Sequence, residues 1–178
     1  KSLLERFGSA EAVLAAPPSQ LREVPGVGVK LARQIVAASD EIDADKELQL
    51  CREHGVTILA DTDPAYPRLL REIHTPPAFL FVHGDLKPED ALAIAIVGTR
   101  HATSYGRQQA ERLAAGLTRA GLTIVSGLAR GIDAAAHRGA LQAGGRTLAV
   151  LGSGVLNVYP PEHKTLAYQL GEALSDMT

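Results

Sequence analysis

The sequence predicts an α/β protein: a mainly parallel, Rossmann-like sheet with helices on both faces, preceded by a small all-helical domain. In the C-terminal part, three apolar runs each end in a glycine-bearing turn; they span residues 94–97, 122–125 and 148–151. Runs this continuously apolar are typical of strands buried on both faces, as in a parallel sheet. A segment suited to a helix follows each turn, which is the alternation expected of an α/β fold.

The three predicted helices of this part cover roughly residues 104–120, 132–143 and 161–174. The first places Ala110, Ala114 and Leu117 on one face, the spacing of a helix that packs on a sheet. The second is rich in alanine, and Gly139 lets it pack close to its sheet. Because crossover connections bring the carboxyl ends of parallel strands to one edge, we expect the three glycine turns to meet there.

The N-terminal part predicts a different organisation, with a helical domain over residues 1–55 and the Rossmann-like domain over residues 56–178. A Pro-Gly-Val-Gly turn at residues 25–28 precedes an amphipathic helix and is similar to a helix-hairpin-helix motif. Such motifs contact phosphate in some proteins, but a single copy in an acidic region favours a packing role. A further helix is expected over residues 40–53. Short β-runs at residues 56–59 and 78–82 could add strands beside the later sheet.

Composition and charge narrow the class of protein. Residues 1–90 hold 10 Lys and Arg against 15 Asp and Glu, a net charge of −5, whereas residues 91–178 hold 8 against 5, a net charge of +3. The basic half is the half with the glycine turns, which favours a polyanionic partner. No apolar run is long enough for a membrane span, and the single cysteine, Cys51, fits a reducing cytosol. We therefore expect a cytoplasmic protein that does not bind membranes.

Several chemistries are not supported by the motifs. The turn after the first strand lacks G-x-G-x-x-G, and no Walker lysine motif occurs, so no nucleotide cofactor is predicted. Neither Ser126 nor Ser153 lies in a nucleophile motif. Asp133 and His137, four residues apart, favour a local helix interaction over a catalytic dyad. The histidines show no metal-ligand spacing, so no metal site is predicted. Because none of these motifs is present, the chain is not expected to be an enzyme.

Phosphate recognition is the chemistry that remains. Backbone amides of glycine turns and guanidinium groups both suit phosphate oxygens, and few acidic residues stand near the two arginines of these turns. The predicted DNA- or phosphate-binding residues are Gly98, Thr99, Arg100, Ser126, Gly127, Arg130, Gly131 and Lys164. Tyr105 and Tyr159 lie close to strand-end turns and are candidates for base stacking.

A series of motifs between residues 60 and 165 resembles the DNA-processing protein A (DprA/Smf) family. The most specific is the block Ser-Gly-Leu-Ala-Arg-Gly-Ile-Asp at residues 126–133. The series also contains Tyr66-Pro67, Pro76-Pro77, Ile96-Val97-Gly98-Thr99-Arg100, Gly144-Gly145-Arg146-Thr147, Gly152-Ser153-Gly154 and Tyr159-Pro160.

This resemblance implies a bacterial cytosolic protein of natural transformation that binds single-stranded DNA, shields it and helps to load the recombinase RecA. It implies a basic pocket that includes Arg100 and a lysine after the Tyr-Pro element, for which Lys164 is the nearest match. A homodimer is implied for the full-length protein. The family domain continues past residue 178, so residues 56–178 are expected to be truncated on the C-terminal side.

Two alternatives stay open. A nucleoside monophosphate phosphoribohydrolase also has a serine-glycine turn after a strand, although its Pro-Gly-Gly-x-Gly-Thr-x-x-Glu segment does not occur here. The other alternative is a scaffold whose helical domain docks a protein partner.

Overall fold

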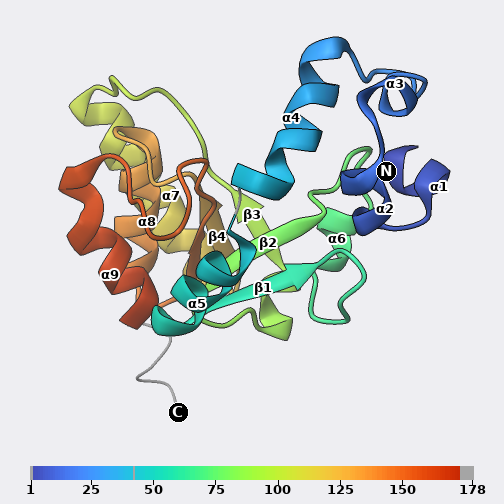
Figure 1. Cartoon of the computed structure of the whole chain (residues 1–178). Coiled ribbons are helices and arrows are strands. Elements are labelled where there is room, and N and C mark those ends of the chain that lie inside the picture. Colours follow the sequence, from blue (N-terminus) through green and yellow to red (C-terminus); the bar gives the residue numbers. More distant parts are fainter. Residues whose placement is uncertain (1, 42, 173–178) are drawn as a thin grey trace. The chain divides into compact units, whose positions relative to one another are not determined.

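The chain divides into two compact units, Lys1–Leu50 and Cys51–Thr178. The computed structural model describes residues 2–41 and 43–172 (Figure 1). The first unit is helical, as predicted, and its elements are α1 Ser2–Phe7, α2 Ala10–Ala15, α3 Pro18–Leu21, α4 Val29–Glu41 and most of α5 Ala44–Glu53.

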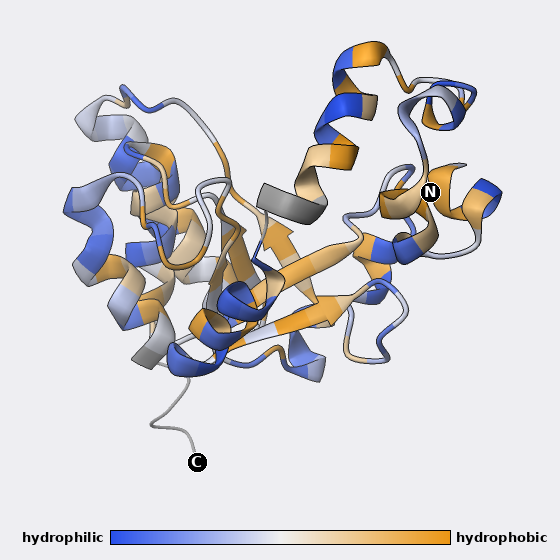
Figure 2. Ribbon diagram, in the orientation of Figure 1, coloured by the Kyte–Doolittle hydropathy of each residue, from blue (hydrophilic) through white to orange (hydrophobic). Residues whose placement is uncertain are grey.

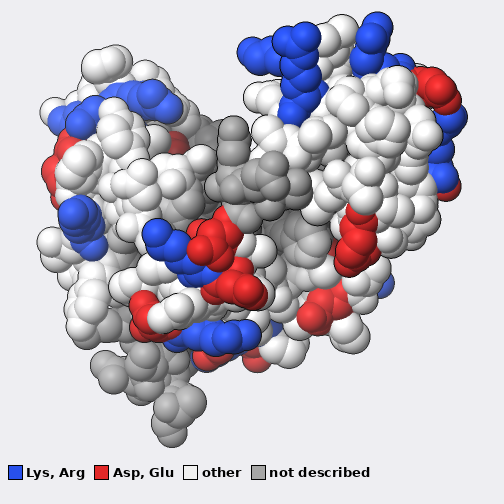
Figure 3. All heavy atoms as spheres, in the orientation of Figure 1, with Lys and Arg blue, Asp and Glu red and all other residues white. Residues whose placement is uncertain are grey.

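Helix boundaries in the first unit follow from local capping. The Ser9 side chain accepts a hydrogen bond from the Ala12 N–H at 3.1 Å and caps α2, and a proline starts α3. Buried Leu21, Val24 and Ala32 join α3 and α4 in one apolar core. Figure 3 shows basic side chains gathered over the start of α4, and side chains of both signs over α5. Helices α1 to α4 therefore form a small packed bundle.

The second unit contains the predicted parallel sheet. Its strands are β3 Ala93–Ala95, β4 Thr123–Ser126 and β5 Thr147–Ala149, in the spatial order β3-β4-β5. Helix α7, Ser104–Arg119, connects β3 to β4, and α8, Ile132–Gln142, connects β4 to β5. After β5 the chain forms the short 3-10 helix η2 Pro161–His163 and α9 Lys164–Glu172. The α/β class and the parallel sheet are confirmed.

Two of the helices lie on the same face of the parallel sheet. Helices α7 and α8 pack against each other and both contact β4 (Figure 2). Ile124 of β4 is fully buried in one cluster with Ala114 of α7 and Ala136 of α8. Sequential strand order with crossovers of one hand puts both helices on the same face of the sheet. Val97, two residues after β3, and Val150, directly after β5, are 70% and 67% exposed.

The prediction that the early β-runs extend this sheet is wrong. Strands β1 Val56–Ala60 and β2 Phe79–His83 pair with each other, antiparallel, in a separate two-stranded sheet. The segment between them turns back on itself because the Tyr66 hydroxyl donates a hydrogen bond to the Pro77 carbonyl at 2.9 Å. This segment includes α6 Arg68–Arg71, and the 3-10 helix η1 Pro88–Ala91 leads from β2 to β3.

Gly139 also has a different role from the predicted one. A Cβ at this position would lie 2.3 Å from the backbone oxygen of Glu111 in α7. The glycine therefore permits close packing of α8 on α7, rather than on the sheet.

Candidate functional site

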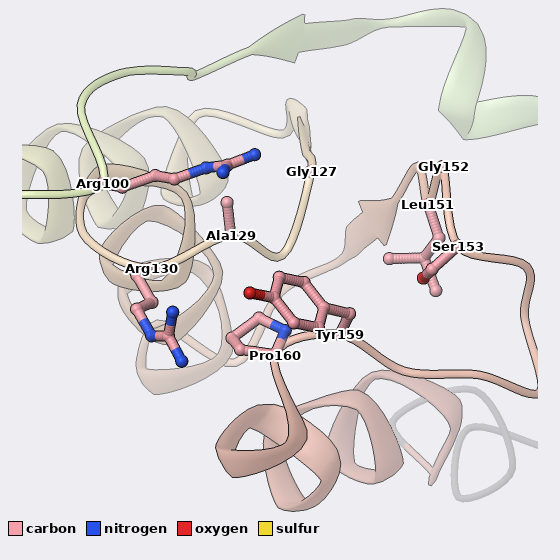
Figure 4. A pocket seen from close by; sticks show the side chains of 9 residues that line it. All are labelled: Arg100, Gly127, Ala129, Arg130, Leu151, Gly152, Ser153, Tyr159 and Pro160. Atoms are coloured by element: carbon pink, nitrogen blue, oxygen red, sulfur yellow. The ribbon is translucent and has the colours of Figure 1, made fainter.

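A hollow of about 270 Å³ lies at the carboxyl ends of β4 and β5, where the predicted glycine turns meet (Figure 4). Arg100 and Arg130 extend along one side of it, and the turn after β5 bounds the other side. The lining residues are Arg100, Gly127, Ala129, Arg130, Leu151, Gly152, Ser153, Tyr159 and Pro160. Four of the predicted site residues are thus brought together: Arg100, Gly127, Arg130 and Tyr159.

The glycine amides in this region already have an acceptor. Asp133, in the first turn of α8, is 6% exposed. Its Oδ1 accepts a hydrogen bond from the Gly98 N–H at 3.3 Å, and its Oδ2 accepts one from the Gly127 N–H at 3.1 Å. The expectation that these two amides are free to bind phosphate is therefore wrong. They hold the turns after β3 and β4 to one buried carboxylate.

The Ser126 hydroxyl is committed within the fold as well. It is buried and donates a hydrogen bond to the Ile96 carbonyl at 2.6 Å, which links β4 to the chain just after β3. Because phosphate oxygens only accept hydrogen bonds, a hydroxyl whose proton is used elsewhere cannot donate to them. Ser126 thus supports the turn from beneath.

Thr99 and Gly131 shape the backbone beside Arg100. The Thr99 side-chain oxygen accepts a hydrogen bond from the His101 N–H at 3.2 Å, and its carbonyl accepts one from the Ile132 N–H at 3.3 Å. Gly131 has φ of +80°, and a Cβ there would lie 2.2 Å from the Thr99 carbonyl oxygen. Only glycine fits this position, where the start of α8 meets the turn after β3.

Arg130 has a carboxylate partner that the sequence did not reveal. Its Nε lies 2.5 Å from Oε1 of Glu162, and both side chains are about half exposed. Its guanidinium carbon also stands 5.9 Å from the centre of the Tyr159 ring. The hydrogen bond to Glu162 raises the pKa of Arg130, and the same bond lowers the pKa of Glu162. The expectation that partners for this arginine are scarce is wrong, although the pair is open to solvent.

Of the remaining predicted residues, Arg100 lines the hollow, whereas Lys164 and Tyr105 do not. The Arg100 guanidinium is exposed, and within the described residues it makes no hydrogen bond or ion pair. Lys164, the first residue of α9, and Tyr105, which is 72% exposed in α7, do not line the hollow. Contact of Lys164 or Tyr105 with DNA stays a prediction.

The Asp133–His137 interaction expected from their spacing is not formed by hydrogen bonding. His137 is fully buried, and its Nδ1–H donates to the Thr147 hydroxyl oxygen at 2.7 Å, since the Thr147 proton is used for the Ile124 carbonyl. Its Nε2 has no hydrogen-bond partner in the described part of the chain. Burial is the main cause that lowers the pKa of His137 to about 4, so the ring is neutral near pH 7.

Sequence reasoning missed the two carboxylates of this region as well as part of its wall. The sequence shows Asp133 and Glu162 but not their hydrogen-bond partners, because these lie as far as 35 and 32 positions away in the chain. Ala129, Leu151 and Pro160 carry no chemical signal in the sequence. Gly152 and Ser153 belong to the predicted glycine turn after the third strand, although neither was predicted as a site residue.

Within residues 2–41 and 43–172, no group of three or more His, Cys, Asp or Glu side chains is placed to hold a metal ion. Over the same described ranges, no helix has both the length and the apolar character needed to cross a membrane.

Comparison with known proteins places the chain in a family. Residues 57–176 match the family described as DNA recombination-mediator protein A. Residues 1–41 match a SAM-like helix-hairpin-helix tandem, whereas the sequence pattern had indicated a single motif. Protein Smf of Synechocystis sp. is 37% identical over 174 residues, which are 96% of this chain and 44% of that protein. DNA processing protein DprA of Bacillus subtilis is 35% identical over 172 residues, which are 93% of this chain and 57% of that protein.

Solved structures agree with this placement. The X-ray structure of DNA processing protein A from Streptococcus pneumoniae superposes with a TM-score of 0.70 at 31% identity, over 96% of this chain and 58% of that chain. A Helicobacter pylori DNA processing protein A, described for its single-stranded DNA binding mode, gives a TM-score of 0.56 at 31% identity, over 66% and 53% of the two chains. The chain spans about half the length of the relatives it matches. It belongs to the DNA recombination-mediator protein A family, whose members are also called DNA processing protein A and Smf.

Proposed function

We propose that this chain binds single-stranded DNA without sequence preference at the hollow lined by Arg100, Arg130 and Tyr159. The observation that carries the proposal is the convergence of two exposed guanidinium groups and an aromatic ring on one open cavity. Guanidinium groups bind phosphate oxygens through paired donors, and an aromatic face stacks on any base. A site that uses only these two features has no means of reading base edges.

The hydrogen bonds of the glycine turns support phosphate binding by side chains rather than by these two backbone amides. The amides of Gly98 and Gly127 are engaged with Asp133, whereas the guanidinium groups of Arg100 and Arg130 line the hollow and carry its positive charge. We infer that affinity depends on the charge of these arginines and falls steeply with salt.

The relatives support a role in DNA metabolism. The family is described as a DNA recombination mediator, and the Helicobacter pylori relative is described as binding single-stranded DNA. We propose that the bound strand is protected and passed to a RecA-type recombinase. A suitable test measures whether the protein speeds the start of RecA ATP hydrolysis on DNA coated with single-strand binding protein.

We also propose that binding involves no bond making or breaking. Among the nine lining residues, all within the described part of the chain, none is a carboxylate or a histidine that could act as a general acid or base. Incubation with AMP and measurement of free adenine tests this, because release of adenine would indicate a phosphoribohydrolase.

The main experiment titrates a fluorescent dT oligonucleotide with the protein at several salt concentrations. The logarithm of the affinity should fall with the logarithm of salt by about 0.7 for each phosphate neutralised. Arg100→Ala should weaken binding to all sequences and reduce this slope by about that amount.

Arg68→Ala is the matched control, because Arg68 is an exposed arginine of α6 that does not line the hollow. Its slope should equal that of the unmodified chain. An unchanged affinity and slope in Arg100→Ala would exclude Arg100 from the site, and no binding by the unmodified chain at low salt would refute the proposed function.

A further inference from the structure

Asp133 presents an apparent contradiction for a site that binds an anion. It is an acidic residue, nearly buried, directly beneath the turns that carry the arginines, and its charge opposes a phosphate above it. A residue that weakens the local positive potential requires a structural reason. That reason is found in its two hydrogen bonds.

The Asp133 carboxylate joins two segments that are far apart in the sequence. Gly98 is 35 positions before Asp133 and follows β3, whereas Gly127 is six positions before it and follows β4. One carboxylate thus fixes both strand-end turns relative to α8. Hydrogen bonds from backbone amides to a charged carboxylate are stronger than those to a neutral acceptor.

The neighbours of Asp133 hold the same turn by contact. A Cβ at Gly98 would lie 2.7 Å from Cγ1 of Ile132, and the Ile132 N–H donates to the Thr99 carbonyl at 3.3 Å. Three successive residues of α8 and its cap, 131–133, therefore meet the backbone of residues 98–100. Arg100 leaves the fold at the end of this clamped segment.

From this geometry we infer that Asp133 is a positioning residue for DNA binding, which acts by holding the turn that presents the Arg100 guanidinium at the hollow. The inference rests on the proposed function and adds a residue that itself touches no DNA. It also predicts whether DNA affinity rises or falls when the charge of Asp133 is removed. Electrostatics alone predicts tighter binding when the Asp133 charge is removed, whereas loss of positioning predicts weaker binding.

The test measures dT oligonucleotide binding by Asp133→Asn, Arg100→Ala and the double variant of the whole chain. An asparagine can accept from only one of the two amides and turns a donor toward the other. We expect Asp133→Asn to weaken binding about tenfold, the size of effect expected when a hydrogen bond to a charged group is lost. In the Arg100→Ala background the same substitution should have much less effect, because the residue through which Asp133 acts is gone.

Glu89→Gln is the control for charge alone. Glu89 is exposed in η1, before β3 and thus at the opposite end of that strand, and its replacement also removes one negative charge. It should leave binding unchanged. If Asp133→Asn does not unfold cooperatively, Asp133→Ser replaces it with the same expected outcomes, because serine has a single side-chain oxygen and likewise cannot accept from both amides.

These measurements distinguish failure of the Asp133 positioning role from failure of DNA binding itself. Equal or tighter binding by folded Asp133→Asn overturns the positioning role and leaves the proposed function intact. Additive losses in the double variant overturn it as well, because they show that Asp133 acts independently of Arg100. Failure of the unmodified chain to bind DNA overturns both.

Discussion

Two carboxylates flank the hollow and differ in what they hold. Asp133 is buried and accepts hydrogen bonds from two backbone amides, whereas Glu162 is about half exposed and accepts from the Arg130 side chain. A phosphate that approaches Arg130 must therefore compete with Glu162. The energy of such an exposed pair is small and is screened by salt, so the competition is real but weak.

Glu162→Gln should accordingly strengthen binding of single-stranded DNA. The substitution removes the competing charge while it keeps the size of the side chain, so Arg130 becomes available to phosphate. We expect an affinity gain of no more than about fivefold at low salt, and a smaller gain as salt rises. Titration of a dT oligonucleotide at low and moderate salt measures both quantities.

Glu72→Gln provides the matched control, since Glu72 is also an exposed glutamate paired with an arginine, Arg68, but lies outside the hollow. Its binding curve should overlay that of the unmodified chain. Weaker binding by Glu162→Gln would mean that Glu162 orients Arg130 for the ligand and does not compete with it.

The residues of the candidate site were predictable from sequence to a limited degree. Arg100 and Arg130 could be placed at one edge because each follows a strand of a parallel sheet, and the structure puts both on the same hollow. The state of the Gly98 amide could not be predicted, because its acceptor is 35 positions away and is reached only once α8 has packed. Residue type identifies a donor, but only the fold shows whether that donor is free.

At the scale of elements, the contact between α7 and α8 depends on small residues. Gly139 is buried in α8 against the backbone of Glu111, and neither backbone can move easily. Gly139→Ala should lower the free energy of unfolding by about 2 kcal/mol, because overpacking outweighs the better helix propensity of alanine. Urea unfolding followed by far-UV circular dichroism measures this loss.

Gly116→Ala is the comparison variant. It makes the same glycine-to-alanine change but should alter the free energy of unfolding in the opposite direction. Gly116 is exposed in α7, and a Cβ there would meet nothing within 4 Å. Alanine should then raise the free energy of unfolding by about 1 kcal/mol through helix propensity. Equal effects of the two variants would contradict the close approach of the helices.

Local patterns predicted the elements better than their partners. The apolar run at residues 56–59 became β1, and that at residues 78–82 became β2, because both carry the alternation or continuity of strands. Their pairing with each other was not predictable from these runs, since it depends on how the turn segment around Tyr66 folds back. The placement of α7 and α8 on the same face of the parallel sheet likewise follows from the strand order β3-β4-β5, which sequence periodicity does not encode.

At the scale of the whole molecule, the division into two units determines how stability can be measured. Unfolding of two units need not be a single transition, so a global signal can mix them. All four tyrosines, Tyr66, Tyr105, Tyr159 and Tyr168, lie in the second unit, and the chain has no tryptophan. Tyrosine fluorescence therefore reports on the unit that contains the candidate site.

This probe allows the buried His137 to be tested by pH. Burial lowers the pKa of His137 to about 4 from its ordinary value of 6.5, so between these values the unfolded chain binds a proton that the folded chain does not. The free energy of unfolding should therefore fall as pH drops, by about 2 kcal/mol between about pH 7 and about pH 4.5 from this group alone. In His137→Gln, urea unfolding followed by tyrosine fluorescence should show that much less pH dependence, whereas His101→Gln, at an exposed position, should behave like the unmodified chain. Parallel pH profiles for His137→Gln and the unmodified chain would show that His137 is not buried in its neutral form.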